Sequence, residues 1–134
     1  MVHKIASDPR AEAKVTALLR ALSIEDESER KRAVAANLHK SLLLPDGTME
    51  RNVEQYSFKK ASENVQFYRI PAAIHEVHEG NSVTVGFKET AERGRRDKYF
   101  VLKKEGVNGL PAPIHIFWPE SDGAEPSVLD MGSL

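Results

Sequence analysis

Apolar residues near the start of the chain recur at the spacing of an α-helix. Asp8 precedes Pro9, and these residue types favour the N-cap and the first helical turn, respectively. The following residues place apolar side chains at positions i, i+3, i+4 and i+7, a spacing that predicts one buried helix face. That face consists of Val15, Leu18, Leu19 and Leu22. The pattern therefore predicts a helix from residue 9 to about residue 22.

Two further helices are expected before residue 65. Acidic residues follow Ser23, and they favour a helix start there because they stabilise the positive end of the helix dipole. This helix is expected to end at the turn sequence of residues 45–47. Thr48 is a candidate N-cap for the next helix, which we expect to end between Ala61 and Asn64. The expected buried faces are Val34, Leu38 and Leu42 in the earlier helix and Met49, Val53 and Tyr56 in the later one.

The second half of the chain has the pattern of β-strands. Residues 82–88 alternate between apolar and polar side chains, which is typical of a strand with one buried face. Gly80 and Asn81 are turn-forming residues and predict a hairpin turn before this strand. The highly charged residues 89–97 are expected to form a loop or the tip of a hairpin. The predicted extended segments are 65–79, 82–88, 98–104, 112–118 and 127–134.

Two of these strands carry apolar residues on both faces. In residues 98–104, Tyr99 and Phe100 point to opposite sides of the predicted strand, and residues 112–118 show the same two-sided pattern. Three helices can cover one face of the sheet, and the sequence supplies no second cover. We therefore expect a homodimer formed through the outer sheet face.

Composition narrows the class of protein. The 134 residues suit a single domain, mainly helical over residues 8–64 and mainly strands over residues 65–134. The net charge of −1 gives no basic excess for binding nucleic acid, and the absence of cysteine excludes disulfides and thiolate chemistry. The N-terminal residues are charged where a signal peptide needs an apolar core, and no apolar run is long enough to cross a membrane. We therefore expect a cytoplasmic protein without nucleic-acid or membrane partners.

The order of elements resembles that of the nuclear-transport-factor-two-like superfamily. The resemblance covers roughly residues 8–134: helices first, then a long strand, a Gly-Asn turn and three more strands. Its local features are the stretch "IHEVHEGNSVTVGF" and the terminal segment "PSVLDMGSL". This superfamily includes the SnoaL-like polyketide cyclases and the ketosteroid isomerases.

The resemblance implies a fold and leaves the function open. The implied fold is α+β, with N-terminal helices packed on a strongly curved antiparallel sheet that forms a cone-shaped α+β barrel. The implied features also include a pocket at the open end of the cone and a homodimer through the sheet. Function does not follow from the fold, because this fold carries isomerases, cyclases, hydrolases and non-catalytic binders. The isomerase constellation of a base, a tyrosine and a protonated acid cannot be assigned to particular residues of this sequence.

The stretch "HEVHE" at residues 75–79 is the densest group of metal-capable side chains in the chain. A zinc-protease motif has its histidines four positions apart on a helix, whereas His75 and His78 are three apart on a predicted strand. On a regular strand these two histidines point to opposite faces, so binding of one metal ion would require a bulge or a helix there. We therefore expect no metal site in this stretch.

His115 is the most interesting single candidate for chemistry. It lies between apolar residues in a predicted central strand, where a neutral imidazole suits a general base or a hydrogen-bond donor, or a structural core role. The catalytic candidates are His115, Asp97 and Tyr99, and Asp130 is a further carboxylic acid. The candidate ligand-binding residues are Tyr56, Tyr68, His115, Phe117 and Trp118.

The sequence favours a ligand-binding protein over an enzyme. The favoured function is binding of a small apolar molecule, without a cofactor, in a pocket between helices and sheet. The alternatives are a SnoaL-like cyclase or isomerase that uses acid/base side chains in that pocket, and a non-catalytic dimeric interaction module. We prefer a binding function because the acidic and basic residues do not converge on a recognisable catalytic arrangement, which catalysis would require.

Overall fold

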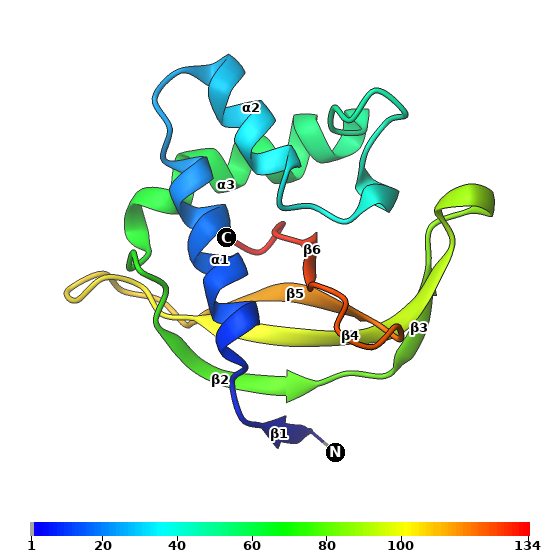
Figure 1. Ribbon diagram of the computed structural model, residues 1–134. Coiled ribbons are helices and arrows are strands. Elements are labelled where there is room, and N and C mark those ends of the chain that lie inside the picture. The colour runs from blue at the N-terminus through cyan, green and yellow to red at the C-terminus, as the bar shows by residue number, and fades with distance from the viewer. Residues whose placement is uncertain (1) are drawn as a thin grey trace.

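The computed structural model describes residues 2–134, apart from the side chain of Thr90. Its described part contains three α-helices and a six-stranded antiparallel sheet, which confirms the predicted α+β class. Figure 1 shows α2 and α3 above the curved sheet, while α1 crosses in front of the strands. The sheet is open and is not closed into a barrel, with β1 and β6 at the two ends of the strand order β1-β2-β4-β5-β6. No helix within residues 2–134 combines the length and apolar character needed to cross a membrane.

The first helix forms where the sequence predicts it. α1 spans Pro9–Leu22, and the side chain of Asp8 caps it by accepting a hydrogen bond from the backbone N–H of Arg10. Its predicted stripe is buried, with Val15, Leu18 and Leu19 fully inaccessible to solvent. A good cap and a continuous apolar stripe act together here, so local and tertiary preferences agree.

The second helix is shorter than the pattern predicts at both ends. α2 spans Glu27–Ala35 with Asp26 as its N-cap, while Ser23 belongs to the end of α1. The segment after Ala35 leaves the helix because Leu38 forms a parallel β-bridge with Val128. A 3-10 turn at Lys40–Leu42 follows. Sheet pairing thus replaces the helical hydrogen bonds that the apolar spacing predicted.

The third helical segment begins later than predicted and changes its winding. A π-helical segment at Val53–Phe58 leads into α3, Lys59–Asn64, so the predicted end is confirmed. A 3-10 turn at Val65–Phe67 follows, where the sequence predicted a strand. The wider π-helical winding changes which side chains face inward. Phe58 is buried, whereas Tyr56, which was expected on the buried face, is 69% exposed.

The strands are β1 (His3–Ile5), β2 (Ile74–Glu79), β3 (Ser82–Val85), β4 (Glu92–Val101), β5 (Ala112–Pro119) and β6 (Ser127–Asp130). Strand β5 matches the prediction closely, whereas β6 begins at the predicted residue 127 but ends at Asp130 instead of continuing to residue 134. β1 is an additional edge strand that the sequence did not indicate, and a 3-10 turn at Lys88–Thr90 connects β3 to β4.

The predicted hairpin turn at Gly80 and Asn81 is wrong. Strands β2 and β3 do not pair with each other. They follow one another along the same side of β4, and both pair with it, so the chain bends between them without reversing direction. Gly80 allows the bend: a Cβ atom there would lie 1.5 Å from the backbone oxygen of Arg96. The residue type was therefore correctly singled out, but its role is a close backbone approach rather than a turn.

The predicted loop or hairpin tip at residues 89–97 is confirmed only for residues 89–91, which lie in the connection between the paired strands β3 and β4, and is wrong for the rest. Residues from Glu92 onward belong to β4, which pairs with β3 on one side and β5 on the other. Its charged side chains are tolerated because they pair within the sheet: Arg95 contacts Asp97, which is completely buried. A strand whose charges are paired locally gives no alternating apolar signal.

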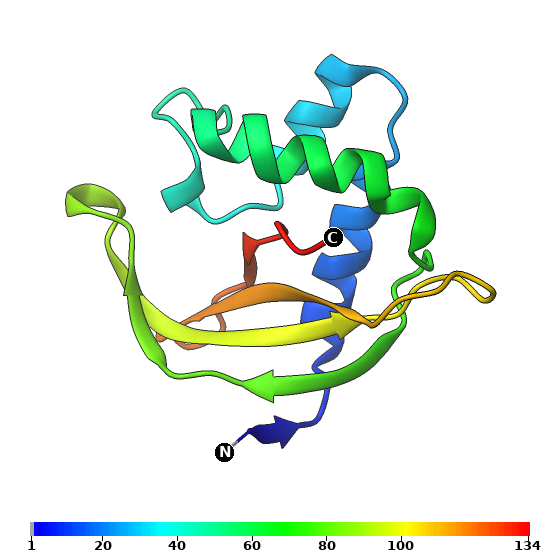
Figure 2. The same cartoon turned by 180° about the vertical axis from the view of Figure 1, so that it is seen from behind.

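The two faces of the sheet have different surroundings. Tyr99 points toward α1, and its hydroxyl oxygen accepts a hydrogen bond from the backbone N–H of Asp8. Lys98 and Phe100 therefore point to the opposite, open face. Figure 2 shows the sheet from behind, where the strands lie in front of α1. The core combines α1, α2 and α3 side chains with those of the central strands.

Candidate functional site

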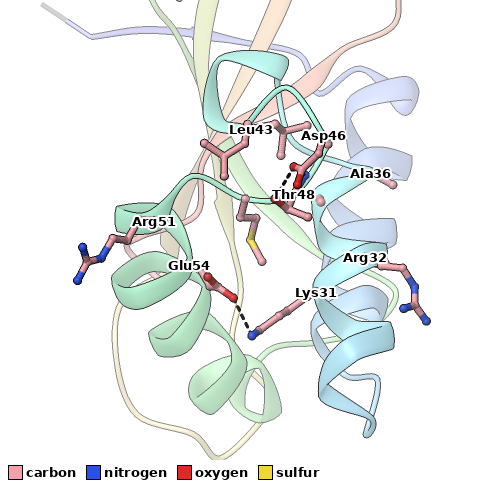
Figure 3. A pocket seen from close by; sticks show the side chains of 12 residues that line it. Lys31, Arg32, Ala36, Leu43, Asp46, Thr48, Arg51 and Glu54 are labelled. Carbon is pink, nitrogen blue, oxygen red and sulfur yellow. Dashed lines mark hydrogen bonds and ion pairs between the residues drawn. The ribbon is translucent and has the colours of Figure 1, made fainter.

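A hollow lies in the helical layer, between α2 and residues 43–54 (Figure 3). Its volume is about 680 Å³, within the range of roughly 300–1,000 Å³ typical of small-molecule sites. Ala35 and Met49 contribute buried apolar surface to it, and Leu43 lines it as well. Leu44 is 46% exposed, a large apolar side chain left open to solvent at this hollow. We call this hollow the α2 groove.

A tight turn fixes one wall of the α2 groove. Leu43 and Met49 form an antiparallel bridge, and the backbone N–H of Leu44 donates to the carbonyl of Thr48 at 2.7 Å. Gly47 occupies the left-handed region at φ 87°, as this turn requires. Asp46 accepts hydrogen bonds from the hydroxyl and the backbone N–H of Thr48, which lower the pKa of its carboxyl. The turn is thus held rigid by its own hydrogen bonds.

An ion pair lies at the other end of the α2 groove. Lys31 of α2 contacts Glu54 of the π-helical segment at 2.7 Å and Glu27 at 3.1 Å. These contacts, led by the one to Glu54, raise the pKa of Lys31, so this amine stays charged and is unsuited to act as a base. Figure 3 shows Arg32 and Arg51 pointing outward on either side. The arrangement suits binding of an elongated molecule more than acid/base chemistry.

The catalytic candidates lie on opposite faces of the sheet. Tyr99 and Asp97 point to the helix-covered face, whereas His115 points to the open face, since it pairs in register with Lys98. Asp97 accepts hydrogen bonds from Arg95 and from the backbone N–H of Gly80, which places it in a structural network. Burial is the main cause that raises the pKa of Tyr99. These three side chains do not converge on one reacting position.

His115 has a defined hydrogen-bonding state. Arg96 donates from Nε to Nδ1 of His115 at 2.6 Å, so the neutral ring carries its proton on Nε2. Burial, followed by the positive charge of Arg96, lowers the pKa of this imidazole, while Asp130 acts in the opposite direction. His115 lines a second hollow of about 400 Å³ on the open sheet face. The structure thus presents a neutral, half-buried imidazole beside a cation.

The predicted ligand-binding residues are scattered. Tyr56 is exposed on the π-helical segment, and Tyr68 lines a separate hollow beside the C-terminal Leu134. Phe117 is fully buried against the ring of His39. Trp118 packs toward the core on the opposite face of β5, beneath the guanidinium of Arg10. None of these four side chains lines the α2 groove.

Phe117 is covered by a residue of its own chain, which weakens the argument for the expected dimer. Phe117 contributed to the apolar outer face that motivated that expectation, but His39 of the same chain covers it. Phe100, also on this face, lies under the imidazole of His78 at 4.4 Å between ring centroids. Less apolar surface therefore remains open than the strand pattern implied.

The "HEVHE" side chains follow the expected alternation only in part: Glu76 and His78 lie on the same side, as predicted, and contact each other. A register shift between Ile74 and Glu76 inserts a bulge, and the carboxylate of Glu76 contacts both His75 and His78. The hydrogen bond with His78 is the main cause that lowers the pKa of Glu76. Across residues 2–134, no group of three or more metal-capable side chains is arranged to hold a metal ion.

The residues of the α2 groove were missed by sequence reasoning. Predicting a helix through residue 44 placed Leu43 and Leu44 on a continuous helix, with no cavity beside them. The available signal was the pair Asp46 and Gly47 followed by Thr48, which is a turn sequence with a side-chain hydrogen bond. Searches against protein-family models, curated proteins and solved structures found no match.

Proposed function

We propose that this protein binds a small, largely apolar molecule in the α2 groove. The observation that carries the proposal is a hollow of about 680 Å³ with an apolar lining and polar groups at its two ends. Burial of an apolar ligand surface would contribute about 25 cal/mol per Å². The rigid turn at Asp46 and Thr48 reduces the ordering cost of binding, since that wall is already formed.

The polar ends suggest how the ligand is oriented. The Lys31–Glu54 pair offers a charged donor and an acceptor at one end, and the Thr48 turn lies at the other. A ligand with a hydrogen-bonding group at one end and an apolar body along Leu43 and Met49 would match this lining. The proposal concerns binding alone, because no group in the groove has the properties of a free general base.

Titration with the neutral fluorescent probe N-phenyl-1-naphthylamine tests the proposal. The wild-type protein should give a saturable rise in fluorescence. Ala36 is exposed and lines the groove, so Ala36→Trp should fill the hollow and weaken binding by about tenfold or more. Ala13→Trp is the matched control, because Ala13 is an exposed helical alanine on α1. Equal binding by all three proteins, or no saturable binding by the wild type, would rule the proposal out.

Membership in the nuclear-transport-factor-two-like superfamily is part of the proposal. The order of helices and strands and the curved antiparallel sheet support it. A cone-shaped arrangement around the helices remains an inference from that resemblance. The cyclase or isomerase alternative has less support, since His115 lies across the sheet from Asp97 and Tyr99.

Homodimerisation through the open sheet face also stays a prediction. Its support is that Phe100 stays partly exposed on this face, although His78 covers one side of its ring, and that β1 is an edge strand. Light scattering at tens of micromolar protein measures the mass directly. A mass of one chain would contradict this prediction without affecting the α2 groove.

A further inference from the structure

One row of cross-strand neighbours crosses the open face of the sheet. Lys4 pairs with His78, His78 with Lys98, Lys98 with His115, and His115 with Asp130. Residues directly opposite each other in antiparallel strands point to the same side of the sheet. These five side chains therefore share one face of the sheet, the one opposite to Tyr99 and α1.

The middle of this row gathers positive charge. Lys98 lies between His78 and His115, and Arg96 lies two residues before it on the same face. Lys98 and Arg96 carry like charges on the same side of β4, and charges of one sign that lie close together repel each other. Lys98 is exposed and forms no ion pair with any residue in the described part of the chain. An anion placed among these donors would relieve the repulsion.

The nearby carboxylates are already engaged. Glu76 contacts His78 and also Lys4. Glu79 contacts Arg95 at 3.5 Å, with His3 on its other oxygen. These pairings leave the centre of the row without a carboxylate of its own.

Asp130 is only loosely associated with the centre. One of its oxygens lies 3.8 Å from Arg96 and the other accepts a hydrogen bond from the backbone N–H of Gly132. The long contact gives Asp130 a weak hold on the guanidinium, which leaves donor capacity on Arg96 for a ligand.

The second hollow opens at the same place. It is about 400 Å³ in volume, and its lining includes Arg96, Lys98 and His115 together with the apolar side chains of Val2 and Val83. His78 and Glu79 line it as well, and the carboxylate of Glu79 is paired with His3 and Arg95. The size of the hollow exceeds that of a simple inorganic ion. Because Nδ1 of His115 accepts from Arg96, its Nε2–H is the ring's donor for a ligand.

We propose that this hollow binds a small organic carboxylic acid. Its carboxylate accepts hydrogen bonds from Arg96, Lys98 and Nε2 of His115, and its apolar body rests against Val2 and Val83. A planar guanidinium beside an ammonium group matches the two oxygens of a carboxylate. This site is separate from the α2 groove, and neither proposal depends on the other.

Benzoate is the probe, with benzamide as its neutral counterpart of nearly the same shape. Addition of benzoate should shift the amide signals of residues 96, 98 and 115 in a ¹H–¹⁵N spectrum, while benzamide should leave them unchanged. Bound benzoate should also raise the pKa of His115, because an anion favours the imidazolium. Acetate and inorganic phosphate should bind more weakly than benzoate, since they lack the apolar body.

Lys98→Met should weaken benzoate binding about fivefold, because it removes a charged hydrogen-bond donor. Lys104→Met is the matched control, an exposed lysine in the loop after β4, and should bind benzoate like the wild type. Equal binding by both variants, or equal binding of benzoate and benzamide, would overturn the proposal. Phosphate binding as tight as benzoate binding would also overturn it, because the hollow would then be a simple anion site.

The dimer prediction and this proposal make opposite forecasts for the same titration. A dimer through this face would cover Lys98 and exclude benzoate. Ala36→Trp should leave benzoate binding unchanged, and Lys98→Met should leave binding of N-phenyl-1-naphthylamine unchanged. Failure at one site is thus distinguishable from failure at the other.

Discussion

Nε of Arg96 lies 2.6 Å from Nδ1 of His115, and this contact determines which nitrogen of the neutral imidazole carries the proton. It joins β4 to β5 across the open face of the sheet. A guanidinium can only donate, so Nδ1 must accept and Nε2 must hold the hydrogen. The contact therefore both orients the ring and disfavours its protonation, with consequences for stability.

The pH dependence of stability should report this imidazole. Burial, then Arg96 and Lys98, lower the pKa of His115 below its ordinary value of 6.5, against the opposing effect of Asp130. The unfolded chain therefore binds this proton more readily than the folded protein. The free energy of unfolding should fall as the pH drops from 6.5 toward the lowered pKa. Above pH 6.5 the ring is neutral in both the folded and the unfolded state, so this group should cause no further change in stability there.

Urea denaturation between pH 5 and pH 7.5 measures this slope, and ring ¹⁵N spectra measure the pKa of His115 itself. His115→Gln should flatten the slope over this interval. Glu76 loses its own stabilising contact only below its ordinary pKa of 4.5, so its effect falls in a lower pH window. A His115 pKa at or above 6.5 would contradict the prediction.

Asp97→Ala should destabilise the protein by about 3 kcal/mol, because it leaves a partly buried backbone N–H and a guanidinium without their acceptor. Asp97 accepts from Gly80 at 2.9 Å and from Arg95 at 2.8 Å. Part of the loss is offset by solvent, since the Arg95 side chain is partly exposed. Asp122→Ala, at an exposed loop position, is the control and should change the free energy of unfolding by less than about 0.5 kcal/mol. Similar urea midpoints for both variants would show that Asp97 is dispensable.

Two glycines separate steric from conformational effects. Gly80→Ala places a Cβ atom 1.5 Å from the oxygen of Arg96, so β2 and β4 must move apart, at a cost of about 3 kcal/mol. Gly47→Ala meets no atom within 4 Å and should cost only about 1 kcal/mol, from the left-handed backbone. Thermal melts of the two variants give the comparison. A Gly80 variant as stable as the Gly47 variant would mean that the bend tolerates a side chain.

Tyr99→Phe should have a small effect on stability. The hydroxyl of Tyr99 accepts from the backbone N–H of Asp8 at 3.1 Å, beside the start of α1. Removing one partially buried hydrogen bond costs about 1 kcal/mol, and the aromatic ring itself remains. Chemical denaturation measures the difference. A loss above about 3 kcal/mol would indicate a larger network around this hydroxyl than the structure contains.

The candidate sites show how much depended on contacts between distant residues. The sequence singled out His115 as a chemically interesting residue, and the structure places it beside Arg96 in a hollow. Nothing in the sequence indicated that Tyr99 and Asp97 would lie on the face of the sheet opposite to His115, because the segment through Asp97 was predicted as a loop. The α2 groove was missed since it exists only where α2 ends early.

The sequence by itself determined the elements whose patterns are local. Asp8 and the apolar stripe specify α1, because the cap and the periodicity act within one segment. The apolar residues of β5 specify a buried strand for the same reason. Tertiary structure decided the rest. Leu38 leaves the helical pattern to pair with Val128, and the chain bends between β2 and β3 at Gly80, where its backbone lies close to that of Arg96. These outcomes depend on hydrogen bonds and close contacts between segments far apart in the chain, which a local pattern of polarity does not contain.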